Sequence, residues 1–260
     1  MKGLYLIPDK MNLGESLKFI EEQGCACEYN DFFLAHILDD KKKQLEIIEM
    51  YAKLRSDFSK DTMHGAFLDV TVHSSDAKIR EISELRIRQS MDIAKEMGLR
   101  GVVVHTNRLY GFRDAVYLKN WKEINKRFFA KISEEYPNQE IYMENMFDEA
   151  PDVLCGLAEE MTDYGNFGVC LDYAHATISD TPAREWMEML APYIRHMHIN
   201  DNDLKNDLHA AVGNGQIDWK SFERELDAYK IDASILIEVA GVEKQRNSLN
   251  YLKRNELLIK

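Results

Sequence analysis

Histidines and acidic residues recur in this sequence inside, or just after, short apolar runs where buried side chains are expected. Imidazole nitrogen and carboxylate oxygen are ligand atoms of zinc, manganese and related divalent ions in proteins. The residue types therefore predict a divalent-metal site. The residues at these positions are His64, His105, His175, His196, His198, His209, Glu144, Asp172, Asp201, Asp207 and Glu238.

Three of the carboxylates, Glu144, Asp172 and Glu238, would repel one another strongly in a shared pocket. At a separation of about 5 Å and an effective dielectric constant of about 20, each pair costs about 3 kcal/mol and three pairs cost about 10 kcal/mol. That sum rivals the stability of a whole domain, on the order of 5–15 kcal/mol. A single Glu in an apolar run can instead be a surface residue at a strand edge. If the three meet, the pocket must hold cations or protons, and the interleaved imidazoles favour cations.

Local spacing adds to this expectation. Asp172 is followed three residues later by His175, and Asp207 is followed two residues later by His209. His196 and His198 alternate along a strand, so they face the same side of it. One of these two histidines is expected to bind a metal, and the other to support it or to lie deeper in the interior.

These side chains need a frame that brings distant segments together. Short apolar or β-branched runs alternate with stretches whose apolar residues recur every three or four positions, which is typical of strands followed by helices. The predicted strands are Gly3 to Ile7, Cys25 to Phe32, Thr62 to Asp69, Gly101 to Thr106, Glu140 to Met146, Phe167 to Asp172, Ile194 to Asp201 and Ser234 to Val239. The predicted helices are Leu13 to Gln23, Asp40 to Ser56, Ala77 to Met97, Asn120 to Tyr136, Pro151 to Met161, Pro182 to Leu190, Trp219 to Tyr229 and Val242 to Leu252.

The alternation predicts an α/β fold, a single (β/α)8 TIM barrel formed by residues 1–260 as one domain. An open doubly wound sheet is the alternative, but its first turn is usually rich in glycine, and PDKMNLGE has one. In a barrel, functional groups collect at the carboxyl ends of the strands. Most of the histidines and carboxylates above fall at those ends.

Composition narrows the class of protein. The 33 Lys and Arg against 45 Asp and Glu give a net charge of -12, which disfavours nucleic acid as a partner. No apolar run approaches the roughly 18 residues of a membrane span. The N-terminal apolar stretch is interrupted by Pro8 and Asp9 and is too short for a signal-peptide core, so we expect a cytoplasmic protein. The four cysteines form no zinc or redox pair pattern.

Several segments together resemble the xylose-isomerase-like barrel group, which contains sugar isomerases and epimerases as well as endonuclease IV. They are HGAFLD, VVVHT, IYMEN, NFGVCLDYAHA, APYIRHMHINDND, DLHAAVGNGQIDW and LIEVAG. The chain looks especially like those described as sugar phosphate isomerase/epimerase. The resemblance implies one metal held by Glu144, Asp172, His198 and Glu238, with the two glutamates as the acid/base pair.

The resemblance to endonuclease IV, which lies more in the ligands than in the overall sequence, implies five further ligands for a three-zinc site. They are His64, His105, His175, Asp207 and His209. The loops from Tyr29 to Leu38 and from Leu68 to Ser75, however, contain no Arg to insert into a duplex. The substrate-binding Arg expected after the seventh strand is also absent, and Lys205 is the nearest cation.

The leading hypothesis is an isomerase or epimerase of a sugar, sugar phosphate or polyol that uses one to three divalent ions of Zn, Mn or Mg. One of Glu144 and Glu238 would remove a proton from carbon to give an enediolate, and the other would return it. The runner-up is a phosphoester hydrolase with two or three metals. The third hypothesis is a sugar-binding or regulatory barrel without chemistry. The expected partner is a small sugar-like molecule, and neither a membrane nor nucleic acid is expected. The sequence leaves open whether the chain forms a homo-oligomer.

Overall fold

The computed structural model describes residues 3–258, whose strands form a closed parallel barrel in the order of the chain. The predicted (β/α)8 fold is therefore confirmed. The strands are β1 (Leu4–Leu6), β2 (Ala26–Tyr29), β3 (Thr62–His64), β4 (Gly101–His105), β5 (Glu140–Glu144), β6 (Phe167–Asp172), β7 (Ile194–Ile199) and β8 (Ser234–Ile237). The helices are η1 (Lys10–Asn12), α1 (Leu13–Glu22), α2 (Ala35–Leu38), α3 (Lys41–Ala52), α4 (Ala77–Met97), α5 (Ala115–Glu135), α6 (Asp152–Glu160), α7 (Tyr173–Ile178), α8 (Ala183–Leu190), α9 (Trp219–Ala228) and α10 (Val242–Arg254).

The predicted elements differ from the observed ones mainly at their ends. Helix α5 begins five residues earlier than predicted, because the side chain of Asp114 accepts the N–H of Tyr117 at 2.8 Å and caps it. Helix α7 was not predicted. It starts directly after β6, where Asp172 accepts the N–H of His175 at 2.7 Å, and its six residues are too few to show a period.

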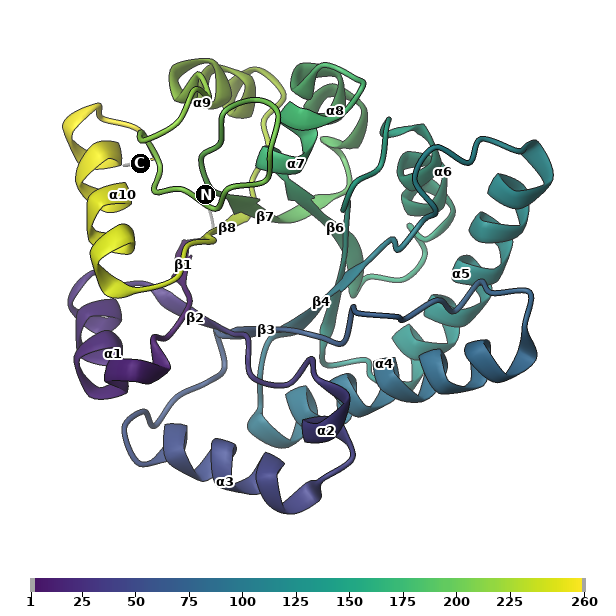
Figure 1. Ribbon diagram of the computed structural model, residues 1–260, viewed down its shortest axis with the longest axis horizontal. Coiled ribbons are helices and arrows are strands. Elements are labelled where there is room, and N and C mark those ends of the chain that lie inside the picture. The colour runs from purple at the N-terminus through teal and green to yellow at the C-terminus, as the bar shows by residue number, and fades with distance from the viewer. Residues whose placement is uncertain (1–2, 259–260) are drawn as a thin grey trace. The chain divides into compact units, whose positions relative to one another are not determined.

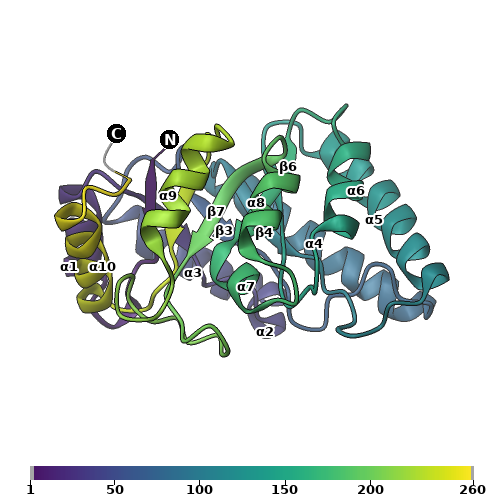
Figure 2. The ribbon, with the colours of Figure 1, turned by 90° about the horizontal axis from the view of Figure 1, so that it is seen from above.

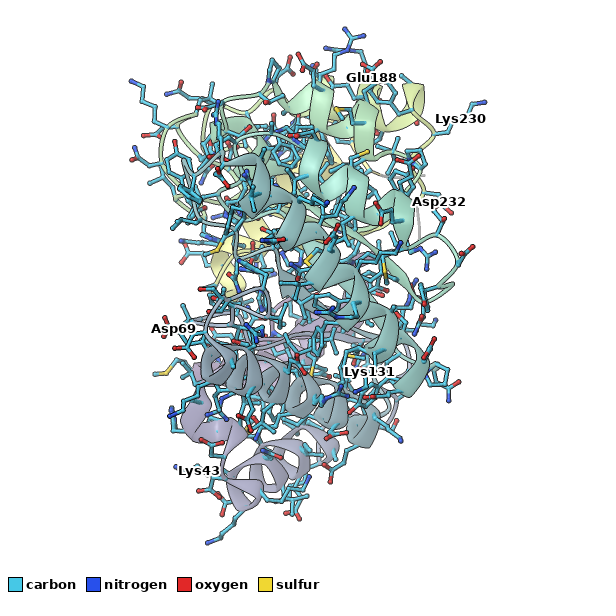
Figure 3. All side chains as sticks on the ribbon, turned by 90° about the vertical axis from the view of Figure 1, so that its right-hand side faces the viewer. Lys43, Asp69, Lys131, Glu188, Lys230 and Asp232 are labelled. Atoms are coloured by element: carbon cyan, nitrogen blue, oxygen red, sulfur yellow. The ribbon has the colours of Figure 1, made fainter. Side chains whose placement is uncertain are left out.

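The chain forms two compact units, which we describe separately. The first unit comprises residues 3–28, 145–151 and 169–258, and the second comprises residues 29–144 and 152–168. Charged side chains such as Lys230 in the first unit and Lys43 in the second are exposed (Figure 3). Among residues 3–258, no helix is both long and apolar enough to cross a membrane.

In the first unit, β8 lies between β1 and β7, and β7 pairs with β6 on its other side. Helices α1 and α10 lie side by side (Figure 1), and the guanidinium of Arg246 is 4.6 Å from the ring centroid of Phe19. Helices α8 and α9 are linked by Tyr229, whose hydroxyl donates to Glu188 at 3.1 Å. These contacts hold the outer helices of the first unit against one another.

In the second unit, β4 lies between β3 and β5. Helices α5 and α6 run side by side (Figure 2), and Glu160 of α6 pairs with Lys122 and Lys126 of α5 at 2.7 and 2.9 Å. Helix α4 is joined to the chain after α5 by the hydroxyl of Tyr136, which donates to Asp92 at 2.8 Å. These contacts fix the helices around the three strands.

Candidate metal centre

Strand register brings three of the predicted ligands of the first unit together. Asp172 of β6 is opposite His198 of β7, and registered residues of parallel strands point to the same face of the sheet. Glu238 follows the registered pair Ile199 and Ile237 by one residue, at the end of β8. Asp172, His198 and Glu238 each offer a ligand atom, and these atoms lie within 4.8 Å of one another.

These three residues belong to a ring-like series in which carboxylates and imidazoles alternate, and its two ends, Asp172 and His198, have ligand atoms within 4.8 Å of each other. We call it the acid–imidazole ring, and its members in order are Asp172, His175, Asp207, His209, Glu238 and His198. The successive N···O distances from Asp172 round to His198 are 3.5, 3.3, 3.2, 3.7 and 3.6 Å. Asp207 and Glu238 therefore each lie between two imidazoles, which offsets part of the repulsion expected among the acidic groups.

The loop between β7 and α9, which carries Asp207 and His209, is anchored by Asp201. Its carboxylate accepts the N–H groups of Gly213 at 2.8 Å and Ile217 at 3.2 Å, and the indole N–H of Trp219 at 2.8 Å. Asp201 is fully buried. It therefore serves as a structural anchor of the loop that presents two of the predicted ligands.

Backbone carbonyls set the tautomers of His175 and His209, two histidines of the acid–imidazole ring. The Nδ1 of His175 is 3.1 Å from the carbonyl of Asn145, and the Nδ1 of His209 is 3.0 Å from the carbonyl of Glu238. Because a carbonyl only accepts, each Nδ1 carries the hydrogen, and each Nε2 faces Asp207. An Nε2 beside a carboxylate needs a proton or a metal ion between them.

The electrostatics of Asp207 and His209 agree with this arrangement. The hydrogen bond with Asp207 raises the pKa of His209 to about 9, although burial opposes the shift. Burial would raise the pKa of Asp207, but hydrogen bonds from His175 and His209 outweigh it and hold that pKa well below its usual range. In the metal-free protein, protons thus stabilise a site whose donor atoms suit a divalent cation.

The second unit holds a group of donors formed by His64, His105 and Glu144. The two Nε2 atoms of the histidines are 2.9 Å apart, and they lie 3.5 and 3.1 Å from Oε2 of Glu144. Ligands around a tetrahedral zinc ion, with bonds of about 2.0–2.1 Å, lie about 3.3 Å apart. The Nδ1 of His64 donates to the carbonyl of Gly65 at 3.0 Å, which leaves its Nε2 as the donor atom. This triangle therefore fits a zinc ion.

Sequence reasoning missed Glu28 of β2, which is fully buried. Its two carboxylate oxygens lie 3.1 Å from Nε2 of His196 and 3.1 Å from Nε2 of His198. Burial would raise the pKa of Glu28, but attraction to His198 and hydrogen bonds from both histidines hold it well below its usual range. The sequence contains a signal for Glu28, because this acidic residue lies inside a predicted strand, as Glu144 does.

Three other residues lie apart from these groups. Lys205, the predicted substrate cation, is exposed, and its backbone N–H donates to Asp203 at 3.1 Å. No ion pair among residues 3–258 joins it to the acid–imidazole ring. His36 is exposed on α2. His73 is half-buried, with its Nε2 3.3 Å from the hydroxyl of Tyr117.

The closed parallel barrel, with acidic and imidazole side chains at its strand ends, is the architecture of a TIM-barrel protein. Residues 30–255 match the family described as xylose isomerase-like TIM barrel. The chain belongs to that family.

Comparisons with individual proteins agree with the family. The uncharacterized protein MJ1614 of Methanocaldococcus jannaschii is 24% identical over 246 residues, which cover 91% of this chain and 89% of that protein. A solved structure of a D-tagatose 3-epimerase-like protein has a TM-score of 0.75 at 22% identity, covering 97% of this chain and 96% of that one. The TTHB071 protein of Thermus thermophilus, soaked with ZnCl2, has a TM-score of 0.77 at 21% identity, with 97% of both chains covered.

Proposed function

We propose that this protein is a divalent-metal-dependent isomerase or epimerase of a sugar or a related polyol. The observation that carries the proposal is the convergence of donor atoms from Asp172, His198 and Glu238 within 4.8 Å. The strand order supports Glu144, at the end of β5, as the fourth ligand, because β5 is the neighbour of β6 in the barrel. The similarity to a D-tagatose 3-epimerase-like structure supports a sugar as the substrate class.

The proposed chemistry is proton transfer at a carbon next to a carbonyl. A bound Mn²⁺ or Zn²⁺ would supply Lewis acidity toward the substrate's oxygens. Glu238 and Glu144 are the proposed acid/base pair, one removing the proton and the other returning it to the opposite face or to the neighbouring carbon. The side chain of Glu238 is 12% exposed and that of Glu144 is 2% exposed, so both are shielded from bulk water.

The test is proton exchange on a panel of ketopentoses and ketohexoses in D2O with Mn²⁺-loaded protein. We expect deuterium at the carbon beside the carbonyl of at least one sugar. Glu238→Gln should lower that exchange at least about 100-fold, because an amide cannot act as a general base. Glu243→Gln, which changes an exposed carboxylate in the first turn of α10, is the matched control and should leave exchange unchanged. Parent-like exchange in Glu238→Gln, or no exchange with any sugar, would contradict the proposal.

A second candidate function is phosphoester hydrolysis with two or three metals. The observation that favours it is the additional triangle of His64, His105 and Glu144 in the second unit. In such a hydrolase, a third metal ion would be held by His175, Asp207 and His209. Metal ions of such sites supply hydroxide near neutral pH.

Elemental analysis and one double variant separate the two functions. The isomerase is expected to contain one ion per chain, and the hydrolase two or three. His64→Gln combined with His105→Gln should leave sugar exchange within about threefold if one metal suffices. If the protein is a hydrolase, the same variant should lose cleavage of bis(p-nitrophenyl) phosphate at least about 100-fold, since metals supply its nucleophile.

A further inference from the structure

Glu28 lies next to a proposed ligand but takes no part in the proposed reaction. We infer that Glu28 is a positioning residue that fixes the ring orientation and tautomer of His198, so that His198 presents Nδ1 as its donor atom. The inference rests on the proposed function, in which His198 is a metal ligand. It adds a residue from β2, a strand to which the proposed site assigns no role.

The geometry around His198 is directional. Its Nε2 is 3.1 Å from Oε1 of Glu28, and its Nδ1 is 3.6 Å from Oε2 of Glu238. An ionised carboxylate carries no hydrogen, so the close approach of Glu28 favours a hydrogen on Nε2 of His198. The lone pair of Nδ1 is then directed toward the side of the ring occupied by Glu238. A metal-binding histidine usually donates its other N–H to an acceptor in this way.

His198 differs from three other predicted ligands in how its tautomer is set. His64, His175 and His209 each place Nδ1 on a backbone carbonyl and present Nε2. They lie at a strand end or in the segments beyond it, where carbonyls are outside the sheet ladder. His198 lies within β7, flanked by β6 and β8, where backbone groups pair with the neighbouring strands. A side-chain acceptor is therefore needed, and Glu28 provides it.

Glu28 is itself held by a second histidine. Its Oε2 is 3.1 Å from Nε2 of His196, whose Nδ1 lies 2.7 Å from the hydroxyl of Ser234. The ring of Tyr5 packs edge-on to His196 with centroids 5.3 Å apart. Glu28 and His196 are fully buried, so the carboxylate is fixed in place. This explains the two histidines of His196-Met-His198. His198 is a proposed ligand, and His196 holds Glu28, the residue that contacts His198.

Metal affinity and histidine tautomer test the inference without using enzyme activity. We expect Glu28→Ala to weaken Mn²⁺ and Zn²⁺ binding by about 10–100-fold in titrations of metal-free protein. Glu28→Gln preserves volume but offers one acceptor for two N–H groups, so we expect about tenfold weaker binding. The matched control is Ser234→Ala, which removes a contact of His196 but leaves Glu28 beside His198. Its metal affinity should stay within about threefold of the parent.

The tautomer is read from ¹⁵N shifts of the imidazole nitrogens in Zn²⁺-saturated protein, because in metal-free protein a second proton can occupy Nδ1 beside Glu238. The parent and Ser234→Ala should show His198 with the hydrogen on Nε2, whereas both Glu28 variants should show mixed tautomers. Glu28→Gln decides the matter if Glu28→Ala does not fold. Parent-like affinity and a single Nε2–H tautomer in the Glu28 variants would overturn the inference while leaving the metal site intact. A parent protein that binds neither metal would overturn the proposed function and this inference with it.

Discussion

At the scale of single residues, His73 shows how burial changes the pKa of a side chain outside the proposed site. Its ring lies among aromatic side chains, with centroids 5.9 Å from Tyr117 and 6.1 Å from Trp121. Burial lowers the pKa of His73 from 6.5 to about 4. The unfolded chain therefore binds a proton at a higher pH than the folded chain does. Stability from neutral His73 is fully present above pH 6.5 and is lost as the pH falls to about 4.

His73→Gln should therefore flatten the pH dependence of stability. We expect the free energy of unfolding of the parent to fall more steeply than that of the variant between about pH 6.5 and 4, by up to about 3 kcal/mol over the window. Urea denaturation at several pH values measures the difference. His36→Gln, which changes an exposed imidazole on α2, is the control and should follow the parent curve. Parallel curves for the parent and His73→Gln would contradict the prediction.

Asp61, directly before β3, is a fully buried carboxylate with charged and polar partners. Both oxygens accept from the guanidinium of Arg55 at 2.7 Å, and Oδ2 also accepts the hydroxyl of Tyr29 at 2.8 Å. Asp61→Ala should lower the free energy of unfolding by about 3–5 kcal/mol, because it leaves a partly buried guanidinium without its counter-ion. Chemical denaturation measures the loss. The double variant Asp61→Leu with Arg55→Met should recover much of it, and a loss equal to that of Asp61→Ala would contradict this account.

At the scale of elements, the conformation of the loop between β7 and α9 depends on the side chain of Asp201 and on Gly215. The carboxylate of Asp201 accepts hydrogen bonds from Gly213, Ile217 and Trp219. Gly215 lies so close that a Cβ on it would be 2.2 Å from Oδ1 of Asp201. The same loop carries Asp207 and His209. The position of these predicted ligands is therefore set by contacts that take no part in chemistry.

Asp201→Ala should lower the free energy of unfolding by about 3 kcal/mol and should speed amide exchange across residues 202–218, because buried N–H donors lose their acceptor. Gly215→Ala should have the same effect on exchange, since its Cβ displaces the carboxylate. Hydrogen exchange followed by mass spectrometry measures both. Gly14→Ala, on α1 with no atom within 4 Å of the added Cβ, is the control and should leave exchange in residues 202–218 unchanged. Unchanged exchange in residues 202–218 of both loop variants would refute the role of Asp201.

At the scale of the whole molecule, the acid–imidazole ring couples metal binding to folding. The unfolded chain separates its six members, so a metal that binds them together stabilises only the folded state. Zn²⁺ or Mn²⁺ at about 100 times its Kd should raise the free energy of unfolding by about 2.7 kcal/mol. Thermal unfolding with metal and with EDTA measures the shift. A variant combining Asp172→Asn with Glu238→Gln should show a much smaller shift, and a full shift in that variant would contradict the proposed ligands.

The alternation of strands and helices was predictable because it depends on local patterns. Helix α4 illustrates this, because its bounds match the prediction. Asp76 accepts the N–H of Lys78 at its start, and Gly98 has a φ of 70° at its end. Both signals lie within the helix's own sequence. Short elements such as α7 were not predictable, because six residues are too few to show a helical period.

The sequence by itself determined which residue types stand at the ends of the strands, because burial and turn signals are local. It also predicted His64, His105 and Glu144 as ligands, and the structure groups their donor atoms. Only the tertiary structure decided that Glu28 reaches His196 and His198, 168 and 170 positions away, and that Asp201 anchors a loop. Those roles depend on strand register and on side-chain orientation. The sequence around each residue indicates neither of them.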